Sequence, residues 1–292
     1  MLEKRLWLLL LLMSFNVSAQ TKGVVVDESG KPIPYVNIWV ENENIGTTSE
    51  ENGEFVIYPS SNSKNLIFSA VGFEKKTVKI TDSQEVRLKE ESYLLDEIIV
   101  SNSKDTKRIE IGKPKNTISQ AFDNGPKIVA KFFPYLPTYK KTKHLKKVTV
   151  LTDSKVEEAT IKLHFYAVDS LGFPSKELLK KDLLLIVKKG VVKNSFDISE
   201  FNLTFPKTGL FVGFEKLLIE RNKLEKTVTD NNSNTKKTQK THYPFLLYNF
   251  VERDFQLEYS GGKWNKQQVI NTDGSIGKVM INEPAISLIL SN

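Results

Sequence analysis

Residues 23–38 read Gly-Val-Val-Val-Asp-Glu-Ser-Gly-Lys-Pro-Ile-Pro-Tyr-Val-Asn-Ile, and this stretch decides the fold of the N-terminal part of the chain. Residues 24–26 form a short β-prone run, and residues 27–30 are typical of a turn. After the two prolines, Val36, Ile38 and Val40 recur with the period of two that places side chains on one face of a strand. The stretch therefore predicts two short strands joined by a turn.

Further short strands follow at regular intervals along the chain. Asn52-Gly53 is a strong hairpin signal, because both residue types tolerate a positive φ angle. The other predicted strands cover residues 55–57, 66–70, 75–80 and 85–88. Many short strands separated by turn residues, with almost no helical periodicity, predict an all-β sandwich over residues 20–100.

Five motifs in this region resemble one known family. They are residues 23–38, Ile45-Gly46-Thr47-Thr48-Ser49, Asn52-Gly53-Glu54-Phe55, Phe68-Ser69-Ala70-Val71-Gly72-Phe73 and Leu95-Asp96-Glu97-Ile98-Ile99-Val100. Together they resemble the carboxypeptidase-regulatory-like domain, a transthyretin-like (prealbumin-like) β-sandwich attached to many bacterial envelope proteins. The resemblance implies a location in the cell envelope, and it implies no reaction.

Residues 1–19 have the pattern of a secretory signal peptide. Lys4 and Arg5 precede an apolar run over residues 6–15, and Val17-Ser18-Ala19 is a small-residue cleavage site. An uncleaved membrane anchor is the alternative, although the run is shorter than the roughly 20 residues that span a bilayer. The chain has no cysteine, so lipid attachment, disulfides, thiolate metal sites and cysteine nucleophiles are all excluded.

The charges are divided unevenly along the chain. Residues 20–100 hold 8 Lys and Arg against 14 Asp and Glu, a balance of −6, whereas residues 101–292 hold 32 against 20, a balance of +12. This division favours a boundary near residue 100. We interpret the polar, turn-rich residues 101–125 as a linker. For an exported protein, an anionic partner of the basic half would be an envelope glycan or a lipid headgroup rather than nucleic acid.

Residues 126–292 are again β-rich and predict a second, jelly-roll-like sandwich. The clearest strand covers residues 159–168, with apolar Ile161, Leu163 and Phe165 on one face. The opposite face carries Lys162, His164 and Tyr166, so we expect an exposed or rim histidine there. Residues 221–242 are rich in asparagine and lysine and predict a flexible surface insertion. No transmembrane segment is expected in the mature chain.

This half is also similar to C-terminal domains that accompany the same regulatory-like module, a resemblance that implies no known activity. The motifs that carry it are His164-Phe165-Tyr166-Ala167-Val168-Asp169, Pro174, Leu178-Leu179, Phe196-Asp197-Ile198, Phe205-Pro206 and Phe211-Val212-Gly213-Phe214-Glu215.

Motifs for catalysis are absent from the sequence. His144, His164 and His242 are the three histidines, and none lies in a His-x-x-Glu or His-Glu-x-x-His arrangement typical of zinc peptidases. No Gly-x-Ser-x-Gly elbow occurs. Adjacent glutamates such as Glu157-Glu158 alternate faces on a strand and cannot face each other across a cleft. We therefore expect no catalytic residues, no metal site, no cofactor and no enzymatic activity.

Three features are candidate contacts to a ligand or partner. Trp264, beside Tyr259 and a Gly-Gly turn, could stack on a sugar ring or could equally fill a core. Lys140, Lys141 and Lys143 form part of the densest basic patch, which could attract phosphates or acidic glycans, or could simply protect a strand edge. Asp96, Glu97 and Ile98 could add as a strand to a partner, as the resemblance to TonB-dependent receptors implies, or could form the last strand of the sandwich.

The sequence thus predicts an exported, non-enzymatic binding or scaffold protein that docks to an envelope protein or glycan through the regulatory-like module. A carbohydrate-binding accessory protein and an uncharacterised hydrolase are the alternatives. The expected location is the periplasm or the outer membrane, with peripheral membrane association or exposure at the cell surface also open.

Overall fold

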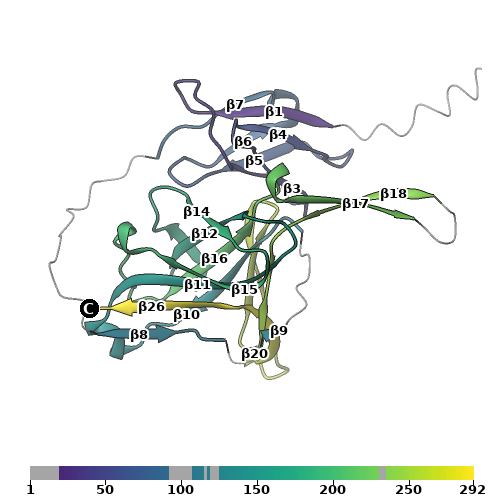
Figure 1. Ribbon diagram of the computed structural model, residues 1–292. Coiled ribbons are helices and arrows are strands. Elements are labelled where there is room, and N and C mark those ends of the chain that lie inside the picture. The colour runs from purple at the N-terminus through teal and green to yellow at the C-terminus, as the bar shows by residue number, and fades with distance from the viewer. Residues whose placement is uncertain (1–19, 92–106, 115–116, 119–124, 230–234) are drawn as a thin grey trace, which may run out of the picture.

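The structure, a computed structural model, describes residues 20–91, 107–114, 117–118, 125–229 and 235–292. The signal-like residues 1–19 and the candidate contacts Asp96, Glu97 and Ile98 lie outside the described residues. Two bodies built of β-sheet lie one above the other (Figure 1), with the N-terminal module at the top. Over the described residues, no helix has the length and apolar composition needed to cross a membrane.

The N-terminal module is a small sandwich of two sheets, as predicted. The first sheet has the order β4 (Glu54–Ile57), β1 (Thr21–Val26) and β7 (Glu85–Arg87). The second has the order β3 (Gly46–Thr48), β2 (Asn37–Val40), β5 (Asn65–Ser69) and β6 (Lys76–Lys79), followed by the 3₁₀ helix η2 (Ile80–Asp82). Val25, Ile38, Phe55 and Phe68 fill the space between the sheets, each with no more than 3% of its surface exposed.

The C-terminal domain is a larger sandwich, again as predicted. Its seven-stranded sheet has the order β13 (Pro174–Glu177), β12 (Ala159–Val168), β16 (Leu210–Lys216), β10 (Ile128–Phe133), β21 (Gln256–Ser260) and β22 (Lys263–Gln267), and β14 (Leu183–Val187) also pairs with β12. The five-stranded sheet has the order β15 (Gly190–Asp197), β11 (His144–Ser154), β26 (Ile286–Ser291) and β8 (Arg108–Ile111), with β19 (Phe245–Leu246) on β11. The chain crosses repeatedly between the two sheets, as in a jelly roll.

Smaller elements complete this domain. They are the sheet β25 (Val279–Pro284), β20 (Tyr248–Arg253) and β9 (Thr117–Ile118), the pair β17 (Lys223–Thr229) and β18 (Lys236–His242), the pair β23 (Val269–Ile270) and β24 (Ile276–Gly277), and the 3₁₀ helices η3 (Pro137–Lys141), η4 (Ser199–Phe201) and η5 (Glu220–Asn222).

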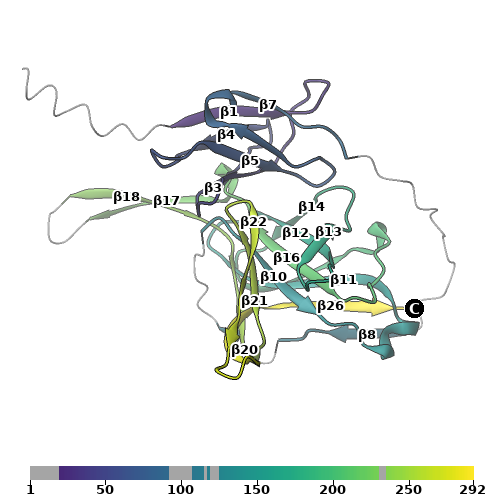
Figure 2. The ribbon, with the colours of Figure 1, turned by 180° about the vertical axis from the view of Figure 1, so that it is seen from behind.

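Two sequence-based assignments need correction. The expected linker 101–125 contains β8 and β9, which pair with β26 and β20 of the C-terminal domain. The expected flexible insertion 221–242 contains η5 and a regular ribbon, because β17 and β18 pair in register from Lys223↔His242 to Thr229↔Lys236. β8 does alternate, as Arg-Ile-Glu-Ile, but over only four residues within a polar segment. The strands of the ribbon face water and lack the apolar alternation by which strands are recognised. The ribbon projects away from the body (Figures 1 and 2).

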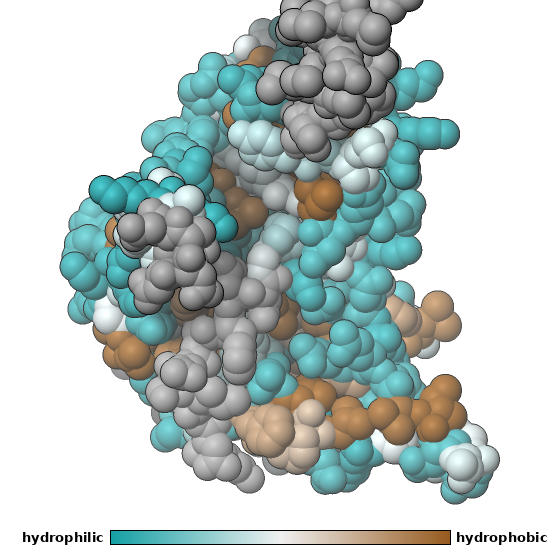
Figure 3. All heavy atoms as spheres, turned by 90° about the vertical axis from the view of Figure 1, so that its right-hand side faces the viewer, coloured by the Kyte–Doolittle hydropathy of each residue, from teal (hydrophilic) through white to brown (hydrophobic). Residues whose placement is uncertain are grey.

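The face toward which this ribbon points is mostly hydrophilic (Figure 3), and its apolar side chains gather along the lower margin. That margin is the end of the molecule that holds β20 in Figure 1.

Candidate functional site at the domain junction

The hairpin turn between β21 and β22 contacts the N-terminal module. The Gly261 carbonyl accepts a hydrogen bond from the Asn42 amide at 3.2 Å, and the Gly262 carbonyl accepts one from Lys75 Nζ at 2.6 Å. The ring of Tyr259 meets Trp39 of β2 edge-on, with 5.9 Å between centroids. The turn singled out in the sequence is therefore part of the contact between the two domains.

Glycine is required at the tip of this turn. Gly262 has φ +84°, and a β-carbon there would lie 2.2 Å from Cδ1 of Ile67, a buried residue of β5. A side chain would both strain the backbone and push the module away. The close approach of the two domains depends on this residue.

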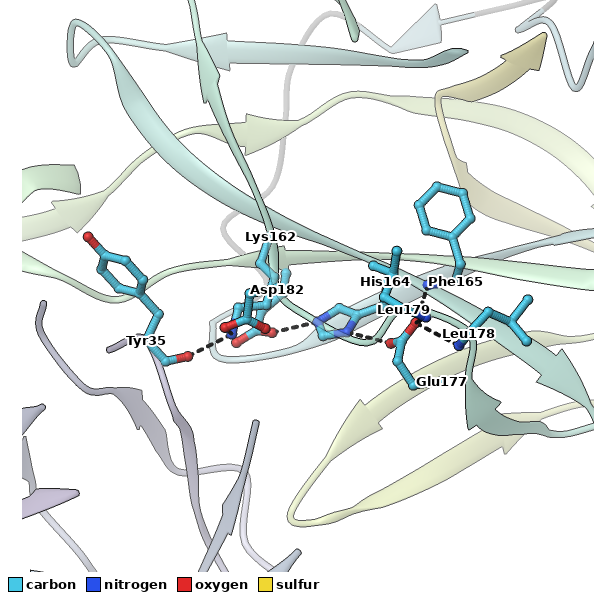
Figure 4. Close-up of polar contacts among 9 residues, drawn as sticks. Tyr35, Lys162, His164, Phe165, Glu177, Leu178, Leu179 and Asp182 are labelled. Atoms are coloured by element: carbon cyan, nitrogen blue, oxygen red, sulfur yellow. Dashed lines mark hydrogen bonds and ion pairs between the residues drawn. The ribbon is translucent and has the colours of Figure 1, made fainter. Parts of the chain in front are cut away.

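Lys162 of β12 is a buried residue that connects the C-terminal domain to the module. Its ammonium group lies 3.0 Å from a carboxylate oxygen of Asp182 and donates a hydrogen bond to the Tyr35 carbonyl of the module at 2.7 Å (Figure 4). Only 1% of Lys162 is exposed. Tyr35 has φ +55°, a conformation that costs a non-glycine residue about 1–2 kcal/mol. Its carbonyl is held in that strained position against a buried cation.

His164, two residues along the same face, lies between two carboxylates. Nδ1 is 2.9 Å from Glu177 of β13, and Nε2 is 2.7 Å from Glu215 of β16 (Figure 4 shows the Glu177 side). The imidazole stacks on Tyr166 at 5.4 Å, with an interplanar angle of 8°. Glu177 also accepts the Phe165 backbone N–H at 2.8 Å, which fixes the carboxylate against β12.

Lys162, His164, Glu177, Asp182 and Glu215 form a buried cluster in which opposite charges stabilise one another. Burial alone would lower the pKa of His164, but the hydrogen bonds that its imidazolium donates to Glu177 and Glu215 outweigh it and raise the pKa to about 9. Burial would raise the pKa of Glu215, but Lys162 and His164 hold it below its usual value. Burial opposes the charge on Lys162 as well, yet Asp182 and Glu215 leave its pKa raised. At neutral pH, Lys162, His164 and Glu215 are therefore all charged, and opposite charges in the cluster stabilise one another.

This geometry is suited to holding structure together rather than to catalysis. A protonated His164 donates from both ring nitrogens and has no lone pair with which to accept a proton. The two glutamates lie on opposite sides of the ring, so they do not converge on one point. No group of three or more His, Cys, Asp or Glu that could hold a metal ion occurs among the described residues.

The expectation of an exposed or rim His164 is wrong, because only 6% of the residue is exposed. Alternation correctly placed Lys162, His164 and Tyr166 opposite the apolar face of β12. A polar face need not face solvent, however. Here the module, β13 and the segment carrying Asp182 cover that face.

Sequence reasoning also missed the partners Glu177, Asp182 and Glu215. Glu215 lies beside Lys162 in the strand register, but that register was not readable from the sequence. A local signal does exist: a lysine and a histidine two residues apart, on a strand whose other face is wholly apolar, need nearby carboxylates if they are covered.

The predicted contact residues fall in different places. Tyr259 and Trp264 lie at the junction, where Trp264 is half-buried and meets Tyr259 and Tyr166 edge-on, each at 5.4 Å. Lys140, Lys141 and Lys143 are exposed in and after η3 and do not belong to the junction.

Comparison with known proteins assigns the class of the module. Residues 21–100 match the family model of the CarboxypepD_reg-like domain, as the motifs predicted. The module is therefore a carboxypeptidase-regulatory-like domain, and this assignment covers that part of the chain alone.

Two curated relatives match about a third of the chain. The TonB-dependent receptor P39 of Formosa agariphila is 31% identical over 111 residues, which are 36% of this chain and 11% of that protein. The TonB-dependent receptor SusC of Bacteroides thetaiotaomicron is 25% identical over 87 residues, which are 30% of this chain and 9% of that protein. The chain thus matches only about a tenth of the length of either relative.

Among solved structures, that of infectious bursal disease virus Gx strain is similar over 93% of this chain and 63% of its own. The sequence identity is 10% and the TM-score is 0.22, so this likeness carries no argument.

Proposed function

We propose that this chain is an exported, non-enzymatic scaffold or binding protein of the cell envelope, which docks to an envelope protein through its regulatory-like module. The observation that carries the proposal is the orientation of the module. Its four-stranded sheet packs on the C-terminal sandwich through Trp39 and Ile67, and its three-stranded sheet β4-β1-β7 faces outward (Figure 2). One sheet is engaged within the chain, and the other is left for a partner.

The outward sheet has the composition of a small docking surface. Val56 and Tyr58 are 39% and 57% exposed, and charged residues surround them. These neighbours, all exposed, are Lys22, Glu54, Glu85 and Arg87. An apolar centre with a charged rim is the usual anatomy of a protein interface. We call this surface the outward sheet face.

The envelope location is supported by the sequence and by the relatives. Residues 1–19 resemble a secretory signal, and the two curated relatives that match part of the chain are TonB-dependent receptors. The absence of enzymatic activity is proposed because the buried histidine His164 is held between two glutamates. Binding through a rigid surface needs no such group to be free.

The test is in-cell cross-linking of the tagged full chain, followed by purification and mass spectrometry. We expect the wild type to recover one specific envelope protein. Val56→Glu and Tyr58→Ser should abolish that recovery, because they place a charge in the apolar centre or remove its ring. Both positions are exposed, so the fold should survive either change.

Ile276→Glu is the matched control. Ile276 is 56% exposed and apolar, but it belongs to the β23–β24 pair of the other domain. The Ile276→Glu variant should recover the same envelope protein in the same amount as the wild type. Recovery of no protein above background, or recovery that is unchanged in Val56→Glu, would overturn the docking proposal.

A further inference from the structure

A cavity of about 300 Å³ lies in the C-terminal sandwich, between β8, β10, β20 and β25. The strands β8, β10 and β20 lie at the end of the molecule opposite the regulatory-like module (Figures 1 and 2). Its volume is at the lower end of the range for small-molecule sites. It is separate from the domain junction and from the outward sheet face.

The floor of the cavity is a buried ion pair. Lys131 Nζ donates to the carbonyls of Gly112 and Ile286 at 2.7 and 2.8 Å and lies 3.2 Å from Glu283. All three ammonium donors therefore have an acceptor. The lysine fixes a positive charge under the cavity without being free to bind anything directly.

Other donors lining the cavity do have unused capacity. Tyr139 is 8% exposed, and its hydroxyl has no hydrogen-bond partner among the described residues. Arg253 donates from Nε to Glu283 at 2.7 Å and from Nη1 to the Glu252 carbonyl at 2.9 Å. Its Nη2 group has no partner within the described part of the chain. The unpartnered hydroxyl of a largely buried tyrosine and a half-paired guanidinium thus line one cavity.

The charges of the lining favour an anion. Lys113, Lys131 and Arg253 supply three positive charges, against one negative charge on Glu283. Lys113 is at the rim, with 72% of its side chain exposed and its ammonium 3.7 Å from Glu110. Phe133, which lies on the same face of β10 as Lys131, adds an apolar aromatic wall. Guanidinium and hydroxyl donors suit a carboxylate, and an aromatic wall suits a ring.

We propose that this cavity binds a small organic carboxylate built on a single ring, with Arg253 and Tyr139 as its direct partners. The carboxylate would accept from Arg253 Nη2 and the Tyr139 hydroxyl, and the ring would pack on Phe133. This site goes beyond the scaffold function, because it lies far from the module and needs no partner protein.

The test is calorimetric titration of the full chain with four probes. Glucuronate and benzoate carry a carboxylate on a sugar ring and on an aromatic ring. Glucose lacks the charge, and inorganic phosphate lacks the ring. We expect one of the two carboxylates to bind with a Kd of about 1 mM or below, and glucose and phosphate to bind at least about tenfold more weakly. The tighter carboxylate identifies the kind of ring.

Variants connect the binding to the cavity. Arg253→Gln should weaken the tighter carboxylate about tenfold or more, and Tyr139→Phe should weaken it severalfold. Lys226→Gln, on the exposed ribbon, should change nothing. Thermal unfolding of each variant checks that the fold is retained. No binding of either carboxylate, equal binding of glucose and glucuronate, or unchanged binding in a folded Arg253→Gln variant would each overturn the proposal.

Discussion

At the scale of single residues, His164 makes the stability of this protein depend on pH. Its pKa is near 6.5 in an unfolded chain and about 9 in the folded protein. The raised value means that the stabilisation is complete below pH 6.5 and is lost as the pH rises through 9. A difference of 2.5 pKa units corresponds to roughly 3 kcal/mol. Urea unfolding at pH 6.5 and pH 9.5 should show a decrease in the free energy of unfolding of that order.

His164→Gln is the control for this effect. The variant should be less stable at pH 6.5 by about 3 kcal/mol, because Glu177 and Glu215 lose the cation between them. Its decrease between pH 6.5 and 9.5 should also be much smaller than that of the wild type. His242→Gln, at the half-buried base of the ribbon, should behave as the wild type. A wild-type profile that is flat over this range would show that His164 is not charged in the folded protein.

Gly262 tests how tightly the two domains fit together. Gly262→Ala introduces two penalties, one from a φ of +84° and one from a β-carbon 2.2 Å from Ile67. Gly274 has almost the same φ, +82°, with nothing within 4 Å of its β-carbon position. Gly274→Ala therefore measures the conformational penalty alone, which is about 1 kcal/mol. In urea unfolding, we expect Gly262→Ala to destabilise the protein by about 1 kcal/mol more than Gly274→Ala does.

The excess should depend on one methyl group. Ile67→Val removes the Cδ1 atom that the new β-carbon would meet. In the Ile67→Val background, the cost of Gly262→Ala should fall to that of Gly274→Ala. An excess that persists in this background would mean that the turn is not held against Ile67.

At the scale of elements, β12 shows how far sequence patterns reach. Its bounds, residues 159–168, and its apolar face were both predicted, because a regular alternation needs no knowledge of the neighbouring chain. What covers its other face could not be predicted. That depends on the position of Tyr35, which is more than a hundred residues away in the sequence. The buried cluster is thus a consequence of tertiary structure that no local pattern records.

The ribbon of β17 and β18 is an element that should be dispensable for folding. Its described residues from Glu225 to Thr229 and from residue 235 to Lys240 are all exposed. Because Glu225 and Lys240 face each other, residues 226–239 can be replaced by an Asn-Gly turn that preserves the pairing. We expect the free energy of unfolding to change by less than about 0.5 kcal/mol in urea titrations. A loss above about 1 kcal/mol would mean that the ribbon stabilises the body.

At the scale of the whole molecule, composition and charge predicted two all-β units but not how they are joined. The difference between −6 and +12 in net charge indicated a boundary near residue 100. The structure shows that charges also lie between the units, in the buried cluster around Lys162. Removing one member of a buried ion network leaves the charges of the others uncompensated. The groups of such a network are therefore expected to form and to break together. Such a junction is expected to couple the two domains.

This coupling can be measured as cooperativity. Calorimetry of the wild-type protein should show one unfolding transition, in which the calorimetric and van't Hoff enthalpies agree. Lys162→Met removes the hydrogen bond to Tyr35 and leaves Asp182 without its cation, while most of the aliphatic stem is preserved. This variant should unfold in two separate steps, because the module then loses its buried, charged attachment to the sandwich. The exposed Lys226→Met is the control and should keep one transition. Two transitions in the wild type would show that the domains are already independent, and the junction would then be a contact surface rather than a structural bond.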